Sequence, residues 1–307
     1  AVAIGTLPSA GSLTLSGAAV TAGQSIAAAD LAAGNLVFIP ERNASGIGYA
    51  SFSFQVQDNG GTAHAGADLD PTPNTITIDV TPANDAPSGS NQTVHIGEDG
   101  AYIFSATDFG FSDPDDTPAD NLFAVAIGTL PSAGSLTLSG AAVTAGQSIT
   151  AADLAAGNLV FTPAGNASST GYASFSFQVQ DDGGTANGGA DLDPTPNTIT
   201  IDVAPVNDAP SGSDQTVHIG EDGAYVFSAT DFGFSDPDDT PANALFGVAI
   251  STLPSAGSLT LSGVAVTAGQ SVTAADLAAG NLVFSPERNA SSTGYASFSF
   301  QVQDDGG

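Results

Sequence analysis

The chain has 307 residues and a formal net charge of −30, because 32 acidic residues face only two basic ones. This balance argues against nucleic acid and anionic membranes as partners, since binding to phosphate groups needs a basic surface. Disorder is disfavoured too, because 41% of the residues are hydrophobic and many alternate with polar ones, as in β-strands. The absence of cysteine excludes disulfides and thiol chemistry, and no apolar run is long enough for membrane insertion.

The sequence repeats with a period of 123 residues. Asn84-Asp85-Ala86-Pro87 recurs as Asn207-Asp208-Ala209-Pro210, and Tyr49, Tyr172 and Tyr295 keep the same spacing. A unit of this size can bury its own core, so the period predicts separate domains in a row. We predict an N-terminally incomplete unit over 1–83, a complete unit over 84–206, and a unit over 207–307 that lacks its last strand.

The first half of the complete unit predicts four strands. Residues 92–96 alternate, with Val94 and Ile96 facing inward, and Gly97-Glu98-Asp99-Gly100 predicts a hairpin turn that leads into a second strand over 101–109. Asp113-Pro114-Asp115-Asp116 must be a loop, because proline cannot sit in a strand interior. The third strand is expected over 123–130 and the fourth around Leu136 and Leu138.

The second half predicts one short helix and three strands. The helix covers 150–157, and the fifth strand follows over 158–162. The sixth strand, 172–180, alternates most clearly, with phenylalanines on one face and Ser and Gln on the other; the seventh covers 198–203. This pattern predicts an all-β fold of tandem seven-stranded Greek-key β-sandwiches, of cadherin or immunoglobulin type, in an extended array.

If each strand reverses the direction of the one before, the acidic motifs collect at the two ends of a unit. The Gly97–Gly100 turn and Asp202 then fall at the C-terminal end, together with the linker that follows. The Asp113–Asp116 loop and the Asp181-Asp182 pair fall at the N-terminal end. Neighbouring units would therefore meet with acidic residues on both sides.

So many carboxylates would repel one another unless a cation lay between them. Calcium takes about 6–8 oxygen ligands, whereas soft metals need Cys or clustered His. We therefore predict Ca²⁺ sites at the junctions; the alternative is that the aspartates only stabilise turns. At the second junction the predicted ligands are Glu98, Asp99, Asp202, Asn207, Asp208, Asp236, Asp238, Asp239, Asp304 and Asp305. At the first junction they are Asp79, Asn84, Asp85, Asp113, Asp115, Asp116, Asp181 and Asp182.

These motifs carry a resemblance to a known family. The linker Asp202…Asn207-Asp208-Ala209-Pro210 resembles the inter-domain linker of cadherins, and Asp236-Pro237-Asp238 and Asp304-Asp305-Gly306-Gly307 resemble their Asp-x-Asp and Asp-x-Gly motifs. The chain is most similar to the bacterial cadherin-like repeats of large RTX-type surface adhesins. That resemblance implies calcium-dependent extracellular repeats. Ala209 departs from the cadherin linker, which has asparagine there, so the number of ions per junction is open.

The resemblance and the acidic junctions together predict extender repeats, stiffened by calcium, in a secreted bacterial adhesin or a surface or biofilm-matrix fibre. Their partners would be the neighbouring repeats, with like chains in a fibre or extracellular polysaccharide as further possibilities. Two alternatives stay open: a calcium-dependent polysaccharide-binding module, and a self-assembling filament or surface-layer subunit. We expect no enzyme, because the paired carboxylates repeat with the period and would lie between units rather than in a cleft.

A few other residues have competing interpretations. Asp191 and Asp193 could bind a second calcium ion or only form a turn. Asn43, Asn166 and Asn289 each begin an Asn-Ala-Ser glycosylation sequon, which in a bacterial protein is most often a chance match.

Overall fold

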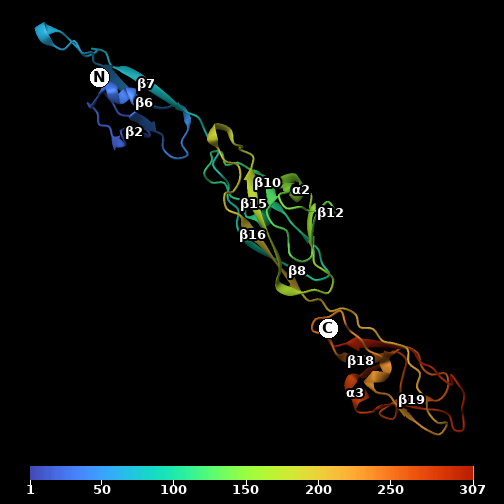
Figure 1. The fold of residues 1–307 in the computed structure, drawn as a ribbon. Coiled ribbons are helices and arrows are strands. Elements are labelled where there is room, and N and C mark those ends of the chain that lie inside the picture. Colours follow the sequence, from blue (N-terminus) through green and yellow to red (C-terminus); the bar gives the residue numbers. More distant parts are fainter. Residues whose placement is uncertain (307) are drawn as a thin grey trace.

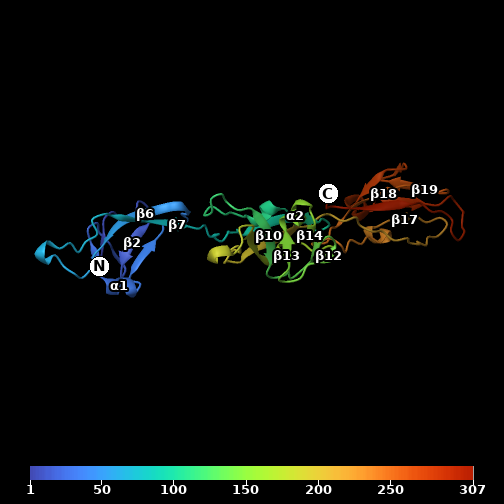
Figure 2. The ribbon, with the colours of Figure 1, turned by 90° about the horizontal axis from the view of Figure 1, so that it is seen from above.

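The computed structural model describes residues 1–306 and shows three β-rich bodies strung in a row (Figures 1 and 2). Each body has its own cluster of buried apolar side chains, and no cluster extends into another body. The chain is all-β, with only short helices between the strands. Among the residues described, no helix has the length and apolar character to cross a membrane.

The middle body is a sandwich of two sheets. The larger sheet has the order β13-β10-β15-β16-β8, built from β8 (Gln92–Gly97), β10 (Leu122–Ile127), β13 (Ser148–Thr150), β15 (Ser169–Asp181) and β16 (Asn197–Ala204). The smaller sheet has the order β12-β11-β14-β9, built from β9 (Tyr102–Ile103), β11 (Ser135–Leu138), β12 (Ala141–Ala142) and β14 (Leu159–Thr162). Every pair is antiparallel except β8 and β16, which run parallel and so end at the same pole.

The alternation of β15 holds this sandwich together. Phe175, Phe177 and Val179 are buried between the sheets, while the serines and glutamines between them face outward, as predicted. Ile199 and Ile201 of β16 are also fully buried. Large apolar and aromatic side chains contribute roughly 1.5–3 kcal/mol each when they leave water, so this shared core is the main source of stability.

Three local predictions need correction. The turn at residues 97–100 is tight, with Gly100 N donating to Gly97 O at 2.9 Å, but it links β8 to β9 in the other sheet and is no hairpin. The predicted strand over 101–109 shortens to β9, because the 3₁₀-helix η2 (Ala106–Phe109) follows it. The stretch between the fourth strand and the helix also holds β12 and β13, so the body has nine strands rather than seven.

The predicted helix is confirmed as α2 (Ala151–Ala155). Its first turn is capped by Thr150, whose hydroxyl accepts from Asp153 N at 3.1 Å. The matching helices are α1 (Ala28–Ala32) and α3 (Ala274–Ala278), and the remaining 3₁₀-helices are η1 (Ala63–Ala65), η3 (Ala186–Gly188) and η4 (Ala229–Phe232).

The outer two bodies repeat the same plan in part. In the first, the sheets are β4-β1-β6-β7 and β3-β2-β5, built from β1 (Val2–Ile4), β2 (Ser12–Leu15), β3 (Ala18–Ala19), β4 (Ser25–Ile26), β5 (Leu36–Ile39), β6 (Gly46–Val56) and β7 (Asn74–Val80). In the third, they are β17-β22-β19-β20 and β21-β18-β23, built from β17 (Tyr225–Val226), β18 (Leu245–Ile250), β19 (Ser258–Leu261), β20 (Val264–Ala265), β21 (Ser271–Thr273), β22 (Leu282–Ser285) and β23 (Phe300–Asp304).

Each outer body lacks part of the largest sheet. Ile76 of β7 is 42% exposed, whereas the matching Ile199 lies on β16, which pairs with β8, and is fully buried. In the third body, residues 215–220 match β8 but form no strand. Gly307 itself, which ends both the third predicted domain and the Asp-Asp-Gly-Gly motif, lies outside the described residues.

Candidate metal sites at the unit junctions

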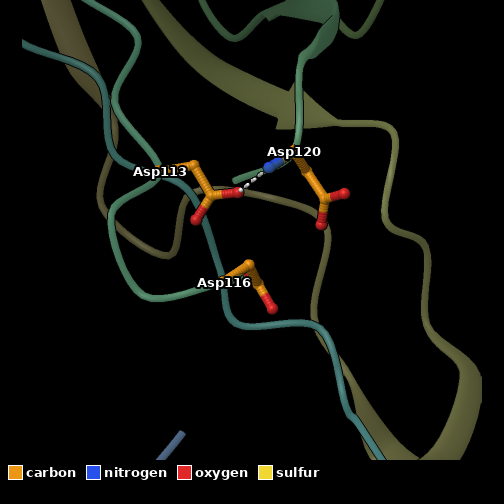
Figure 3. A group of neighbouring side chains, drawn as sticks. All are labelled: Asp113, Asp116 and Asp120. Atoms are coloured by element: carbon orange, nitrogen blue, oxygen red, sulfur yellow. Dashed lines mark hydrogen bonds between the residues drawn. The ribbon is translucent and has the colours of Figure 1, made fainter. Parts of the chain in front are cut away.

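Three aspartates converge at the N-terminal pole of the middle body. Asp113, Asp116 and Asp120 lie on the loop between η2 and β10, and one carboxylate oxygen from each lies within 4.8 Å of the others (Figure 3). Asp113 is buried, and its Oδ2 accepts from the backbone amide of Asp120 at 3.0 Å. Two oxygens on opposite sides of a calcium ion are separated by roughly twice the 2.3–2.6 Å bond length, so this spacing suits a shared ion.

The incoming linker closes over this loop. Asn84 Nδ2 donates to Asp181 Oδ1 at 3.0 Å and to Ala190 O at 2.6 Å, and Asp85 N donates to Asp116 Oδ2 at 2.9 Å. Asp181, the last residue of β15, is only 2% exposed. The linker, the loop and the end of β15 therefore meet at one point.

The same contacts recur at the N-terminal end of the third body. Asp208 N donates to both carboxylate oxygens of Asp239 at 3.2 and 3.3 Å, and Asn207 Nδ2 donates to Asp304 Oδ1 at 3.2 Å. Asn243 Nδ2 donates to Asn207 Oδ1. Asp236, Asp239 and Asp304 are all buried.

The C-terminal end of the middle body contributes one acidic residue, Glu98, to the second junction. Glu98 is 2% exposed, and its Oε1 accepts from Val206 N at 2.9 Å, where β16 gives way to the linker. Glu98 N also donates to Ala204 O at 3.0 Å. This placement follows from the parallel pairing of β8 and β16, which brings the turn after β8 beside the linker.

The observation that points most clearly to a cation is a set of buried side-chain oxygens without a hydrogen-bond partner. In the described chain every such side-chain atom is an acceptor oxygen at a junction: Asn84 Oδ1, Asp113 Oδ1, Asp181 Oδ2, Glu98 Oε2, Asp208 Oδ2, Asp236 Oδ1 and Asp236 Oδ2. Burial of an unpaired polar group costs about 1–3 kcal/mol, and more for a charged group. A cation would satisfy all of these atoms, whereas an anion or a further acceptor would satisfy none.

The electrostatics of the poles agree with this assignment. Burial, and then the charges of Asp116, Asp181 and Asp120, raise the pKa of Asp113. Burial likewise raises the pKa of Asp208, with added repulsion from Asp99, Asp239, Asp238 and Glu98, so acids of both bodies face the linker. Burial also raises the pKa of Asp120 and of Asp236, with neighbouring acids adding to both shifts. A bound divalent cation would reverse these effects, because it stabilises the ionised form.

The donor set fits calcium among the common metals. The unpartnered atoms are carboxylate and amide oxygens, which hard cations prefer, and no thiolate or imidazole nitrogen lies among them. Calcium also tolerates irregular ligand geometry, whereas magnesium demands a near-ideal octahedron.

The structure places some predicted ligands elsewhere. Asp202 lies on the outer face of β16, where its Oδ1 accepts from Gly171 N at 2.6 Å and its Oδ2 lies 3.3 Å from His95 Nδ1. Asp79 accepts from Gly48 N in the same way. Asp182 and Asp305 accept from the backbone amides of Asn121 and Ala244 at 2.7 Å. These four acids already have local partners.

Asp191 and Asp193 also have partners within the middle body. Asp193 is buried, but its Oδ2 accepts from Gly89 N and Asn197 Nδ2, and its Oδ1 from Thr195 N, each at 2.8 Å. Asp191 Oδ2 accepts from Gln180 Nε2 at 3.0 Å. Asp193 therefore ties the linker to the start of β16, which favours the turn role.

Two features of the junction were not predicted from the sequence. Asp120 joins the aspartate cluster, and the matching position in the third body is Asn243. Gly183 is also required, because a Cβ there would lie 1.9 Å from Asn84 Oδ1 and 2.1 Å from Asp120 Oδ2. The repeated Asp-Asp-Gly sequence was the available signal for Gly183, whereas nothing in the loop pattern singles out Asp120.

Comparison with known proteins places the middle body in a family. Residues 88–200 match the family model described as cadherin-like. A crystal structure of human mucin-like protocadherin EC1-2 aligns with 67% of this chain and 84% of its own, at 16% identity and a TM-score of 0.30. No curated protein sequence matches the chain. Cadherin-like domains are in general extracellular, adhesion-type, non-enzymatic modules that bind calcium. Residues 88–200 of this chain therefore form a cadherin-like domain of β-sandwich architecture.

Proposed function

We propose that the chain is a run of extender repeats whose neighbouring β-sandwiches are tied together by calcium ions at their junctions. In this proposal the domains cover 1–83, 84–206 and 207–307. The observation that carries it is the set of seven unpartnered buried oxygens, all at the junctions and all suited to a hard cation.

The ligands come from separate parts of the chain, which is how an ion would stiffen it. At the second junction Glu98 belongs to the middle body, Asp208 to the linker and Asp239 to the third body, and the charges of Glu98 and Asp239 both add to the raised pKa of Asp208. An ion held by all three would fix the relative position of the two bodies. Without the ion, the same acids would repel one another, and the two bodies would be free to bend relative to each other.

Such a rod suits display at a distance from a surface. The resemblance to the repeats of RTX-type adhesins supports a secreted bacterial adhesin or an extracellular fibre, with neighbouring repeats as the immediate partners. The net charge of −30 would also keep parallel chains apart unless cations neutralised them.

Small-angle X-ray scattering with excess calcium and then with chelator tests this function. We expect the maximum dimension to fall and the distribution of interatomic distances to broaden after chelation, while far-UV circular dichroism stays unchanged. A maximum dimension that does not respond to chelation would contradict the proposal.

A further inference from the structure

An equivalent hydrogen bond crosses each of the two junctions, between the same two positions of the repeat. Asn43 Nδ2 donates to Asp115 Oδ1 at 3.1 Å, and Asn166 Nδ2 donates to Asp238 Oδ1 at 2.7 Å. The donor belongs to the upstream body and the acceptor to the downstream one, 72 residues later in each case. The recurrence makes the contact a property of the repeat rather than of one loop.

The upstream turn is shaped by its own body. Asn43 and Asn166 have a φ of 58° and Asn289 one of 55°, in the left-handed region that asparagine enters more readily than most residues. A tyrosine of the same body fixes the turn, since Tyr172 Oη accepts from Ala164 N at 3.0 Å; Tyr49 and Tyr295 do the same for Glu41 and Glu287. Asn289 adopts this conformation although the described chain has no body beyond it. The donor is therefore in place before any contact forms.

The acceptor is the acid of its loop that the aspartate cluster leaves free. Asp113 and Asp116 face the cluster, whereas Asp115 and Asp238 are exposed and are directed at the upstream turn. The Asp-Pro-Asp motif thus divides its acids between the buried cluster and the neighbouring body. A hydrogen bond to an ionised acceptor is shorter and stronger than one between neutral groups, and it constrains direction.

The only two basic residues of the chain sit beside this turn. Arg42 and Arg288 directly precede Asn43 and Asn289, and Arg42 Nη2 lies 3.6 Å from Asp115 Oδ2. The middle body has Gly165 at this position, so Asn166 makes the contact to Asp238 without an arginine. Both arginines of a chain with 32 acidic residues therefore lie directly before an Asn-Ala-Ser turn.

We propose that the Asn-Ala-Ser turn is a docking site for the Asp-Pro-Asp loop of the following repeat, and that it sets the rotation between neighbouring domains without a metal ion. The contact uses the amide nitrogen that N-glycosylation would modify, so the sequon asparagines serve as junction residues rather than glycan acceptors. The docking site does not depend on the calcium proposal, because its partner is the exposed acid and not the buried cluster.

Distance measurement in chelator tests the docking site directly. The chain has no cysteine, so Ala142→Cys on β12 and Ala265→Cys on β20, both exposed, allow one spin label in each body. In chelator, double electron–electron resonance should show a broader distance distribution than with calcium, but one that keeps a single preferred distance set by the docked turn. Asn166→Gly, which keeps the left-handed backbone and removes the amide, should broaden it. The matched control is Asn289→Gly, which changes the same turn in the third body, outside the junction that lies between the two labels, and should leave the distance unchanged.

Two further variants separate docking from a change in the turn. Asn166→Asp puts two carboxylates together and should broaden the distance more than Asn166→Gly. The exchange N166D/D238N reverses donor and acceptor and should restore the distance distribution of the parent chain. A distribution in chelator that Asn166→Gly does not broaden beyond that of the parent chain would overturn the docking site. A distribution that calcium narrows equally in the parent chain and in Asn166→Gly, with no difference between the two in chelator, would overturn it while supporting the calcium proposal.

Discussion

Val206 N donates a 2.9 Å hydrogen bond to Oε1 of Glu98, while the other oxygen of the same carboxylate is buried without a partner. The two residues are 108 positions apart and meet because β8 and β16 run parallel to the same pole. One oxygen thus holds the outgoing linker, and the other is directed into the acidic junction. The Glu98 carboxylate therefore connects the linker directly to the proposed ion site.

Replacement of Glu98 by glutamine should separate these two tasks. An amide oxygen can still accept from Val206, but one negative ligand is lost. We expect calcium affinity at the second junction to fall about tenfold, or ~1.4 kcal/mol, by isothermal titration calorimetry. The control is Glu221→Gln, at the matching position of the third body, where the side chain is exposed rather than buried. Equal calorimetric traces for Glu98→Gln and the parent chain would contradict a role for Glu98 as a ligand.

The effect of Asp236→Asn on the thermal midpoint should be positive without calcium and negative with it. Both oxygens of Asp236 are buried and unpartnered, so removal of the charge should raise the thermal midpoint of the metal-free chain by a few degrees. With calcium present the same variant loses a ligand and its midpoint should fall. Asp305→Asn is the control, since Asp305 accepts from Ala244 N and should respond alike in both conditions. Differential scanning calorimetry measures the thermal midpoint with and without calcium. A shift of the midpoint in the same direction under both conditions would refute the role of Asp236 as a calcium ligand.

The stabilisation of the fold by calcium should decrease as pH falls. Burial raises the pKa of Asp113, Asp120, Asp208 and Asp236 in the folded chain. A raised pKa means that the folded state binds more protons than the unfolded one, so the metal-free chain gains stability from these groups as pH falls through their folded pKa toward about 3.9.

Calcium requires the same groups to be ionised, so its contribution is lost over the same range. The gap between the thermal midpoints with calcium and with chelator should therefore close between neutral pH and about pH 4. Carboxylates outside the junctions contribute alike to both conditions and cancel in the difference. A gap that stays constant across this range would show that the titrating acids do not bind the ion.

Gly183→Ala should open the first junction. The added Cβ would meet Asn84 Oδ1 at 1.9 Å and Asp120 Oδ2 at 2.1 Å, so the linker must move. We expect a loss of about 1–3 kcal/mol in unfolding free energy by urea titration, together with weaker calcium binding at this junction. Gly220→Ala is the control, because nothing lies within 4 Å of a Cβ there. Unchanged calcium affinity in Gly183→Ala would contradict the close packing of linker, loop and strand end.

The sequence predicted the middle sandwich well where burial imposes a period. The alternation of Phe175 and Phe177 with serine and glutamine fixed β15, and Ile199 and Ile201 fixed β16, because one-sided burial allows a single register. The strands β12 and β13 were missed because two- and three-residue ladders are too short to show a period. The turn at 97–100 was mistaken for a hairpin because a tight turn looks alike whether its strands share a sheet or change sheets.

The acidic poles were predictable from strand direction, but individual ligands were not. Six predicted residues, Asn84, Glu98, Asp113, Asp181, Asp208 and Asp236, carry the unpartnered oxygens. Asp202 could have been set aside from the sequence, because Ile201 and Val203 face inward and the residue between them must face outward. Asp120 could not be found in that way, since side-chain directions in an irregular proline-containing loop follow no period.

A crystal structure of residues 1–307 grown with calcium would locate the junction ions themselves, through the density beside the unpartnered oxygens. We expect an ion about 2.3–2.6 Å from Glu98 Oε2 and Asp208 Oδ2, and another beside Asp113, Asp116 and Asp120. Water molecules or protonated carboxylates at those positions, with no ion despite millimolar calcium, would contradict the calcium proposal.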